Sequence, residues 1–396
     1  VGVLLLAGSG CPVPDDDVTG DDDATGDDDA TGDDDATGDD DATGDDDATG
    51  DDDTTGDDDA TGDDDDSYAC TGEWEPLASV GSFLSWIQAI AVHDDPARLA
   101  AATSGTLELF DLSVPEAPTP DVTFDTLDVG PWGVWGDVTD APWGFAATGE
   151  TAVGPLAVYH ALTVEVTLAG STLGPRLELT HSVNRIAVDA ERIVAAGPTA
   201  ISFLEHTGTD VVLVETRNYG QDLIWINDVA VHGDTAIVTS YTGGLMLIPM
   251  DPLQPMTALS TVGNPQSPLS TPDGWLIPST GNFWVGCNGA LQLLDLAAGT
   301  LDFLATAPCI SSFDAEDGPF QGALFAGELF LANSESGVLR LPWTPPTLAV
   351  PNSTTLTPAI WPDVPTYPMR LERLDDVLVL TGVFGDSVGM VRICEP

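Results

Sequence analysis

Short apolar strands recur along this chain with a period of about 43 to 47 residues, beginning near Trp86. The clearest unit holds four strands, separated by turns rich in Asp, Pro, Gly and Ser, at 85–93, 98–102, 106–112 and 121–125. This period is typical of one four-stranded blade of a β-propeller. One small sheet cannot bury both faces, so the units must stack, and a ring leaves no unit at an open end. The sequence therefore predicts an all-β propeller.

Six further copies of the unit follow the first one. Two well-formed copies begin at Val183 and Trp225, and another spans 132–148. The weaker copies begin near Pro265, Gln321 and Met369. We therefore expect seven four-stranded blades, while departures in the weaker copies leave a count of six to eight open.

The seventh unit has only three strands before the sequence stops. A strand over 73–80, ahead of the first complete unit, can supply the missing one. It would pair antiparallel with the last strand, over 388–394, so that the two ends of the propeller close the ring.

Five cysteines are present, and none has the CxxC spacing of a zinc site. With Cys11 set aside, the other four allow three disulfide pairings in an oxidising compartment. Ring closure would bring Cys70 beside Cys394. We therefore expect the disulfides Cys70–Cys394 and Cys287–Cys309.

A hexapeptide, Asp-Asp-Asp-Ala-Thr-Gly, repeats through residues 15–66 and carries 28 of the 66 acidic residues of the chain. Such a tract buries no apolar surface and its like charges repel one another, so residues 12–69 are expected to be a disordered linker ahead of a propeller domain at 70–396. The tract lacks the bidentate Glu that ends an EF-hand loop. We expect no cofactor, and at most weak, diffuse Ca²⁺ association with the tract.

The segment 1–11 is apolar, ends in Cys11 and resembles the end of a secretory signal peptide whose start is missing. It is also similar to a bacterial lipobox: Gly10 and Ser9 fit the two positions before the lipidated Cys, while Gly8 stands where Leu is usual. Lipidation of Cys11 would make the protein a lipoprotein of the bacterial outer membrane or cell surface. The alternative is a cleaved signal peptide and a secreted or periplasmic protein.

The charge of the predicted propeller limits its partners. The remaining 38 acidic residues face nine arginines, and the chain has no lysine. Such a surface repels phosphate backbones and anionic lipid, so we expect no nucleic acid and no membrane contact except through a lipid anchor. A monomer with a protein or glycan partner is expected.

The first unit resembles the repeat of LVIVD-repeat propellers, in which an apolar strand ends in Asp-hydrophobic-Ser followed by two spaced prolines. The segment 107–118 carries the whole pattern, and the segments 245–255 and 291–296 carry parts of it. The resemblance covers most of residues 85–345. It implies a binding or scaffolding propeller of bacterial surface proteins and supplies no catalytic residues.

Aromatic and amide residues recur where the first strand of each unit begins. The Trp positions are Trp86, Trp132, Trp225 and Trp361, and the amide positions are Gln88, Asn184, Asn227 and Gln321. In a propeller these segments converge on one end of the central channel, where Trp rings could stack on a sugar or peptide and amides could hydrogen-bond it. The alternative is structural: Trp rings pack between blades, and amides satisfy neighbouring backbone groups.

No catalytic motif is present. The five histidines form no cluster, and the sequence has no HExxH or P-loop pattern. We therefore expect a non-enzymatic binding module without catalytic or metal-binding residues. The alternative is a propeller hydrolase or lyase that uses acidic residues, with or without calcium, at the end of the channel.

Overall fold

The computed structural model describes residues 74–81, 87–125, 134–153, 156–220, 226–261, 263–280, 289–307, 321–332, 337–344, 354–356, 368–382 and 387–394. Residues 67–396 form one compact unit. The described residues of this unit form strands, turns and bends, and none of them lies in a helix. The signal-peptide, lipobox and linker predictions for residues 1–69 lie outside the described residues.

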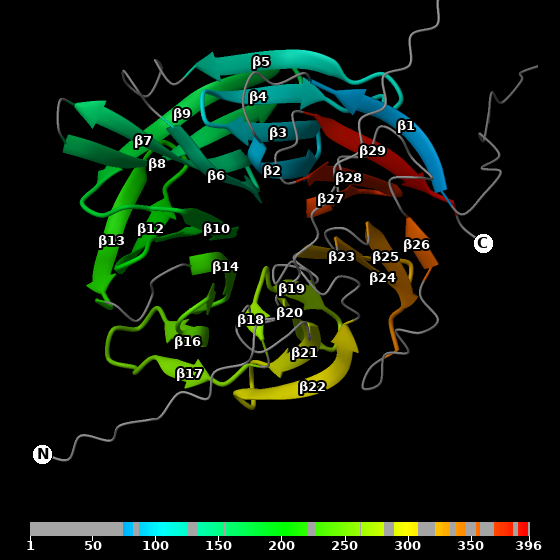
Figure 1. The fold of residues 1–396 in the computed structure, drawn as a ribbon. Helices are drawn as coiled ribbons and strands as arrows, with labels where there is room; N and C mark the ends of the chain where they lie inside the picture. Colours follow the sequence, from blue (N-terminus) through cyan, green and yellow to red (C-terminus); the bar gives the residue numbers. More distant parts are fainter. Residues whose placement is uncertain are drawn as a thin grey trace, which may run out of the picture. The chain divides into compact units, whose positions relative to one another are not determined.

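Seven small antiparallel sheets form a ring, which confirms the seven-bladed propeller (Figure 1). In blades 1 to 3 the strands follow chain order from the centre outward. Blade 1 consists of β2 (Ile87–Asp94), β3 (Ala97–Thr103), β4 (Thr106–Asp111) and β5 (Thr119–Asp125), and blade 2 of β6 (Val134–Ala141), β7 (Gly144–Val153), β8 (Leu156–Thr167) and β9 (Gly170–Leu179). Blade 3 consists of β10 (Arg185–Asp189), β11 (Arg192–Ala196), β12 (Ala200–His206) and β13 (Val211–Asn218).

Blades 4 to 7 repeat the arrangement. Blade 4 consists of β14 (Ile226–His232), β15 (Thr235–Ser240), β16 (Gly244–Pro249) and β17 (Thr257–Leu259). Blade 5 consists of β18 (Asn264–Pro265), β19 (Leu269–Thr271), β20 (Gly274–Thr280), β21 (Gly289–Asp295) and β22 (Thr300–Ala307). Blade 6 consists of β23 (Gln321–Phe325), β24 (Glu328–Ala332), β25 (Val338–Pro342) and β26 (Thr354–Leu356), and blade 7 of β27 (Pro368–Leu374), β28 (Val377–Gly382), β29 (Val388–Ile393) and β1 (Trp74–Val80).

Blade 5 differs from the simple four-stranded plan because its innermost strand is interrupted. β18 and β19 both pair with β20, and residues 266–268 separate them. Pro268 has no backbone N–H to give to a ladder, which favours a break at this place. The backbone N–H of Gln266 instead donates to the carbonyl oxygen of Pro278 at 2.7 Å.

The ring closes through its own two ends, as the sequence predicts. β1 pairs antiparallel with β29, from Trp74 opposite Ile393 to Val80 opposite Val388 (Figure 1). Cys394, directly after β29, is buried and disulfide-bonded. The other cysteines lie outside the described residues, so both predicted pairings stay predictions.

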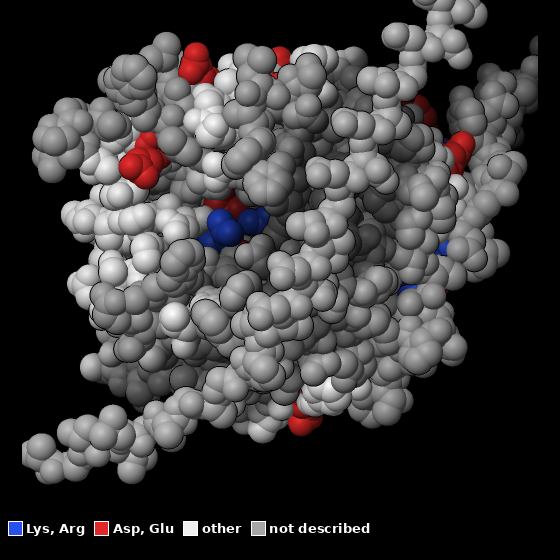
Figure 2. Space-filling model, viewed as in Figure 1, with Lys and Arg blue, Asp and Glu red and all other residues white. Residues whose placement is uncertain are grey.

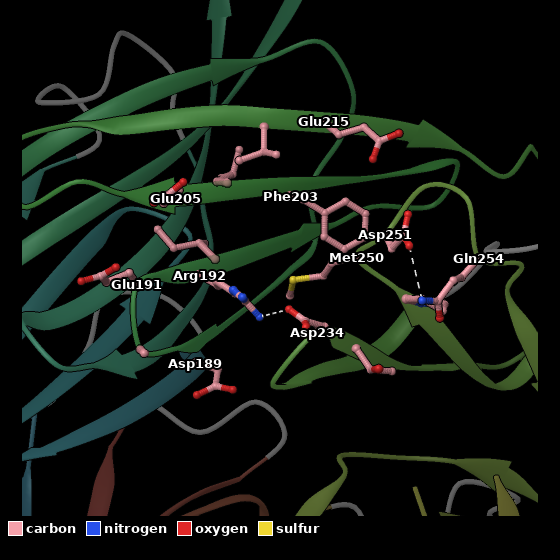
Figure 3. A pocket seen from close by; sticks show the side chains of 16 residues that line it. Asp189, Glu191, Arg192, Phe203, Glu205, Glu215, Asp234, Met250, Asp251 and Gln254 are labelled. Carbon is pink, nitrogen blue, oxygen red and sulfur yellow. Dashed lines mark hydrogen bonds and ion pairs between the residues drawn. The ribbon is translucent and has the colours of Figure 1, made fainter. Parts of the chain in front are cut away.

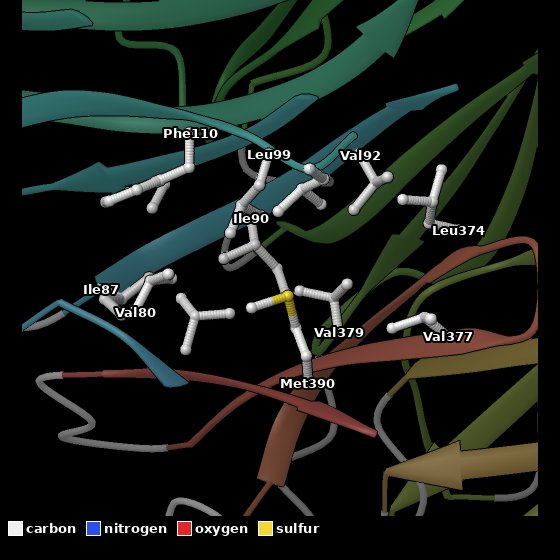
Figure 4. Packing of buried hydrophobic residues seen from close by; sticks show 13 residues of the cluster. Val80, Ile87, Ile90, Val92, Leu99, Phe110, Leu374, Val377, Val379 and Met390 are labelled. Atoms are coloured by element: carbon white, nitrogen blue, oxygen red, sulfur yellow. The ribbon is translucent and has the colours of Figure 1, made fainter. Parts of the chain in front are cut away.

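Apolar side chains fill the seams between neighbouring blades. The described residues form seven hydrophobic clusters, one for each pair of adjacent blades. At the closing seam, Met390 of blade 7 and Val80 of β1 pack with Ile90 and Leu99 of blade 1 (Figure 4). Every blade therefore buries both faces of its sheet, which is the condition that predicts a ring.

None of the described segments is a helix with the length and apolar character needed to span a membrane.

Candidate functional site

The innermost strands of all seven blades surround a central channel, which encloses a cavity of about 270 Å³. Its lining mixes polar residues with aliphatic ones, as expected for strands that also pack between blades. Seven polar or charged residues also line it: Asp137, Thr139, Asp228, Ser267, Gln321, Arg370 and Glu372. Because each inner strand begins at the same end of the ring, blades distant in sequence contribute to one site.

Local irregularities place several of these side chains. Four inner strands have a β-bulge next to their first residues, in β2, β6, β14 and β27. Gln88 and Asn227 occupy the extra position in β2 and β14, and Asp137 lies within the longer bulge of β6. A bulge locally changes the direction of a side chain, so residues that a regular strand would place between blades can turn toward the channel.

Polar contacts connect the inner strands of blades 2, 3 and 4. The carboxylate of Asp137 accepts a hydrogen bond from the backbone N–H of Ile186 at 2.9 Å, in a buried environment. The guanidinium of Arg185 donates through Nε to the carbonyl oxygen of Asn227 at 2.5 Å. Inner-strand polar residues thus fix the positions of adjacent blades.

Amide side chains make similar connections farther around the ring. Asn227 donates to Oδ1 of Asn264 at 2.7 Å and to the carbonyl oxygen of Pro265 at 2.6 Å. Gln321 donates to the carboxyl group of Glu372 at 2.8 Å, and its Oε1 accepts from the backbone N–H of Leu371 at 3.3 Å. Both amides therefore join neighbouring blades, which is the structural role that the sequence left as the alternative.

Charged groups of both signs gather around the channel. Figure 2 shows basic and acidic side chains next to one another near the middle of the visible face. Burial raises the pKa of Asp137, against the attraction of Arg185 and Arg370. Burial also lowers the pKa of Arg185, and repulsion from Arg370 adds to this effect. These shifts indicate that groups from blades 2, 3 and 7 interact within a poorly solvated space.

The pKa of Glu372 is also shifted. Burial raises the pKa of its carboxyl group from 4.5 to about 8, although the hydrogen bond from Gln321 and the charge of Arg370 oppose the rise. Glu372 is therefore mostly protonated at neutral pH and can donate a hydrogen bond. Arg370, two residues away on β27, has no hydrogen bond or ion pair within the described residues.

The sequence-predicted site residues divide into three groups. Trp86, Trp132, Trp225 and Trp361 lie outside the described residues. Gln321 lines the channel, and Asn227 lies at the junction with blade 5. Gln88 and Asn184 are exposed side chains that do not line the cavity, and Asn184 accepts a local hydrogen bond from Ser182 at 3.3 Å.

The charged channel residues Asp137, Asp228, Arg370 and Glu372, and Arg185, whose pKa they influence, were not among the predicted positions. A signal for them exists in the sequence, since each is a charged residue within an inner strand that also carries buried apolar residues. The described residues contain no cluster of three or more His, Cys, Asp or Glu side chains that could hold a metal ion.

No protein-family model matches this chain, and no curated protein is similar to it in sequence. Solved structures are similar in fold. A chain in a structure titled "Crystal Structure of Mitotic Checkpoint Complex" has a TM-score of 0.54 and 9% identity, covering 81% of this chain and 96% of its own. The WD40 β-propeller domain of Doa1 has a TM-score of 0.52 and 12% identity, with coverage of 80% and 96%. At these identities the likeness shows a shared propeller fold.

Proposed function

We propose that this protein is a surface-anchored bacterial lipoprotein, related to LVIVD-repeat propellers, whose propeller binds a protein or glycan partner at the channel. The observation that carries the proposal is the channel itself. Blades 2, 4 and 7 bring buried or half-buried groups of both charges into one cavity, and Arg370 there has no hydrogen bond or ion pair within the described residues. Convergent polar groups with shifted pKa values in a cavity are typical of ligand sites.

Binding should depend on the channel charges. We expect a ligand found by screening the full-length protein against glycans and candidate partner proteins to lose about tenfold or more in affinity with Arg370→Gln or Asp228→Asn. A charge-assisted hydrogen bond contributes about 1.5 to 3 kcal/mol, and 1.4 kcal/mol corresponds to a factor of ten. Calorimetric titration measures the change. Trp86→Ala and Trp225→Ala test the aromatic residues predicted near the same end.

An exposed carboxylate outside the channel supplies the control. Asp302→Asn in β22 should leave the affinity unchanged. Equal affinities for the wild type and both channel variants would reject the channel as the binding site, whatever the ligand.

The anchor is tested separately. Cys11→Ser should move the protein from the membrane fraction to the soluble fraction, since the proposed acyl chains would be attached to this thiol. Mass spectrometry of the peptide containing Cys11 checks the modification directly. An unmodified Cys11 in membrane-bound protein would contradict the lipoprotein proposal and leave the channel proposal untouched.

A second candidate function is a propeller hydrolase or lyase. The observation that favours it is Glu372, because a carboxyl group with a pKa of about 8 is suited to donate a proton at neutral pH. Turnover of a glycan ligand by the wild type and its loss in Glu372→Gln would support catalysis. Binding without turnover supports the first proposal.

A further inference from the structure

A second hollow lies between blades 3 and 4, at the end of the ring where the inner strands finish. It encloses about 820 Å³, and the β10–β11 and β14–β15 turns and the loop after β16 contribute to its walls (Figure 3). We call this hollow the groove. The groove and the channel cavity have no lining residue in common, so the groove is a separate surface.

The floor of the groove is apolar. Phe203 of β12 and Met250, directly after β16, lie next to each other in its centre (Figure 3). Arg217 covers the Phe203 ring, with its guanidinium carbon 4.7 Å from the ring centre, and pairs with Glu215 at 2.8 Å. This network belongs to the floor and joins β13 to blade 4.

Carboxylates surround this floor. The lining contains six of them, at Asp189, Glu191, Glu205, Glu215, Asp234 and Asp251, against the single guanidinium of Arg192. That guanidinium is itself paired with Asp234 (Figure 3). The side chains of Glu191 and Glu205 are exposed and have no hydrogen bond or ion pair in the part of the chain that the structure describes. The groove therefore keeps a negative charge that the protein does not neutralise.

The outer strand β13, whose residues Val214 and Glu215 line the groove, begins with an exposed apolar run. Val212, Leu213 and Val214 of β13 are 38%, 47% and 64% exposed, and they are the only run of consecutive exposed large apolar residues in the described chain. A β-bulge leaves Val214 unpaired, and its side chain lines the groove. In the loop that carries Asp251 and Gln254, Leu253 is 90% exposed.

Four of the other outer strands lack this character. β1, β5 and β9 each contain a proline, and in β22 the exposed Phe303 follows an exposed Asp302. Prolines and charges of this kind keep sheet edges from associating with other chains. β13 has neither in its first four residues, and exposed apolar patches of this type mark interaction surfaces.

We propose that the groove binds an extended, basic segment of another protein, in which Lys or Arg alternates with aliphatic residues. The aliphatic side chains would cover Val212, Val214 and Leu253, and the basic ones would reach Glu191 and Glu205. The negative charge of the groove excludes occupants that are themselves negatively charged. A second copy of this chain, with no lysine and a net charge of −57, is repelled, as are anionic lipids and nucleic acids.

A fluorescent ten-residue peptide that alternates Lys and Val tests the groove in the full-length protein. We expect binding that weakens between 20 and 200 mM NaCl, because the contacts are surface ion pairs. The double variant Glu191→Gln/Glu205→Gln should lower the affinity by about three- to tenfold at low salt. Val214→Ser should weaken binding at both salt concentrations. A peptide with Glu in place of Lys should not bind.

The control must separate the groove from the aspartate tract, which also attracts cations. Asp302→Asn/Glu178→Gln makes the same change in charge at exposed positions on blades 5 and 2 and should bind like the wild type. A benzophenone group in the peptide should cross-link to residues 203–215 or 250–254. Cross-links confined to residues 15–66, or equal affinities for the two double variants, would overturn the proposal.

Discussion

Replacing Cys394 with Ala should lower the free energy of unfolding by about 4 kcal/mol. Cys394 is 2% exposed and disulfide-bonded, and it follows the strand that closes the ring with β1. A disulfide that closes a long loop removes conformational freedom from the unfolded chain, which gives about this magnitude if the bond is unstrained. Urea denaturation of both proteins measures the difference.

The same measurement with a reductant is the control. If the disulfide accounts for the effect, wild type and Cys394→Ala should become nearly equal in stability once the bond is reduced. A difference that persists would show that packing of the thiol at the end of β29, rather than the covalent link, stabilises this seam.

The second large effect is expected from Glu372→Gln, and it should depend on pH. The pKa of Glu372 is raised from 4.5 to about 8 in the folded protein. Its stabilising contribution is therefore complete below pH 4.5 and is lost as the pH rises through 8. Through this effect the free energy of unfolding can fall by at most about 5 kcal/mol. The amide introduced by the substitution cannot ionise, so the variant should match the wild type near pH 5 and exceed its stability by about 2 to 5 kcal/mol at pH 9.

Thermal and urea unfolding at several pH values tests this expectation. Glu178→Gln, at an exposed position of β9, should keep the pH dependence of the wild type. The difference in stability between Glu372→Gln and the wild type could instead be the same at pH 5 and pH 9. The carboxyl group would then not be held in its neutral form, and the description of the channel as poorly solvated would fail.

Much of the fold follows from the sequence because propeller blades repeat a local pattern. The strands predicted at 98–102 and 106–112 lie at Ala97–Thr103 and Thr106–Asp111 in the structure. Ring closure follows from counting strands. The seventh unit has only three strands of its own, so the segment before the first unit must supply the fourth. The interruption of the inner strand of blade 5 is harder to predict from the sequence. It depends on which backbone groups of β20 pair with β18 and which pair with β19.

The site is less predictable from sequence than the fold. Alignment of the units placed Gln88, Asn184, Asn227 and Gln321 at one position, but bulges in some inner strands and not in others shift this register. Asn184 therefore precedes β10, whereas Gln321 begins β23 and lines the channel. The charges of Asp137, Arg185 and Glu372 acquire their properties only when distant blades bury them together.

The account rests on a ring held closed by the pairing of β1 with β29, and the partner of Cys394 tests it most directly. Proteolysis without reduction, followed by mass spectrometry, identifies the linked peptides. We predict that Cys394 is joined to Cys70, four residues before Trp74, which lies opposite Ile393. A peptide that joins Cys394 to Cys287 or Cys309 would contradict the closure.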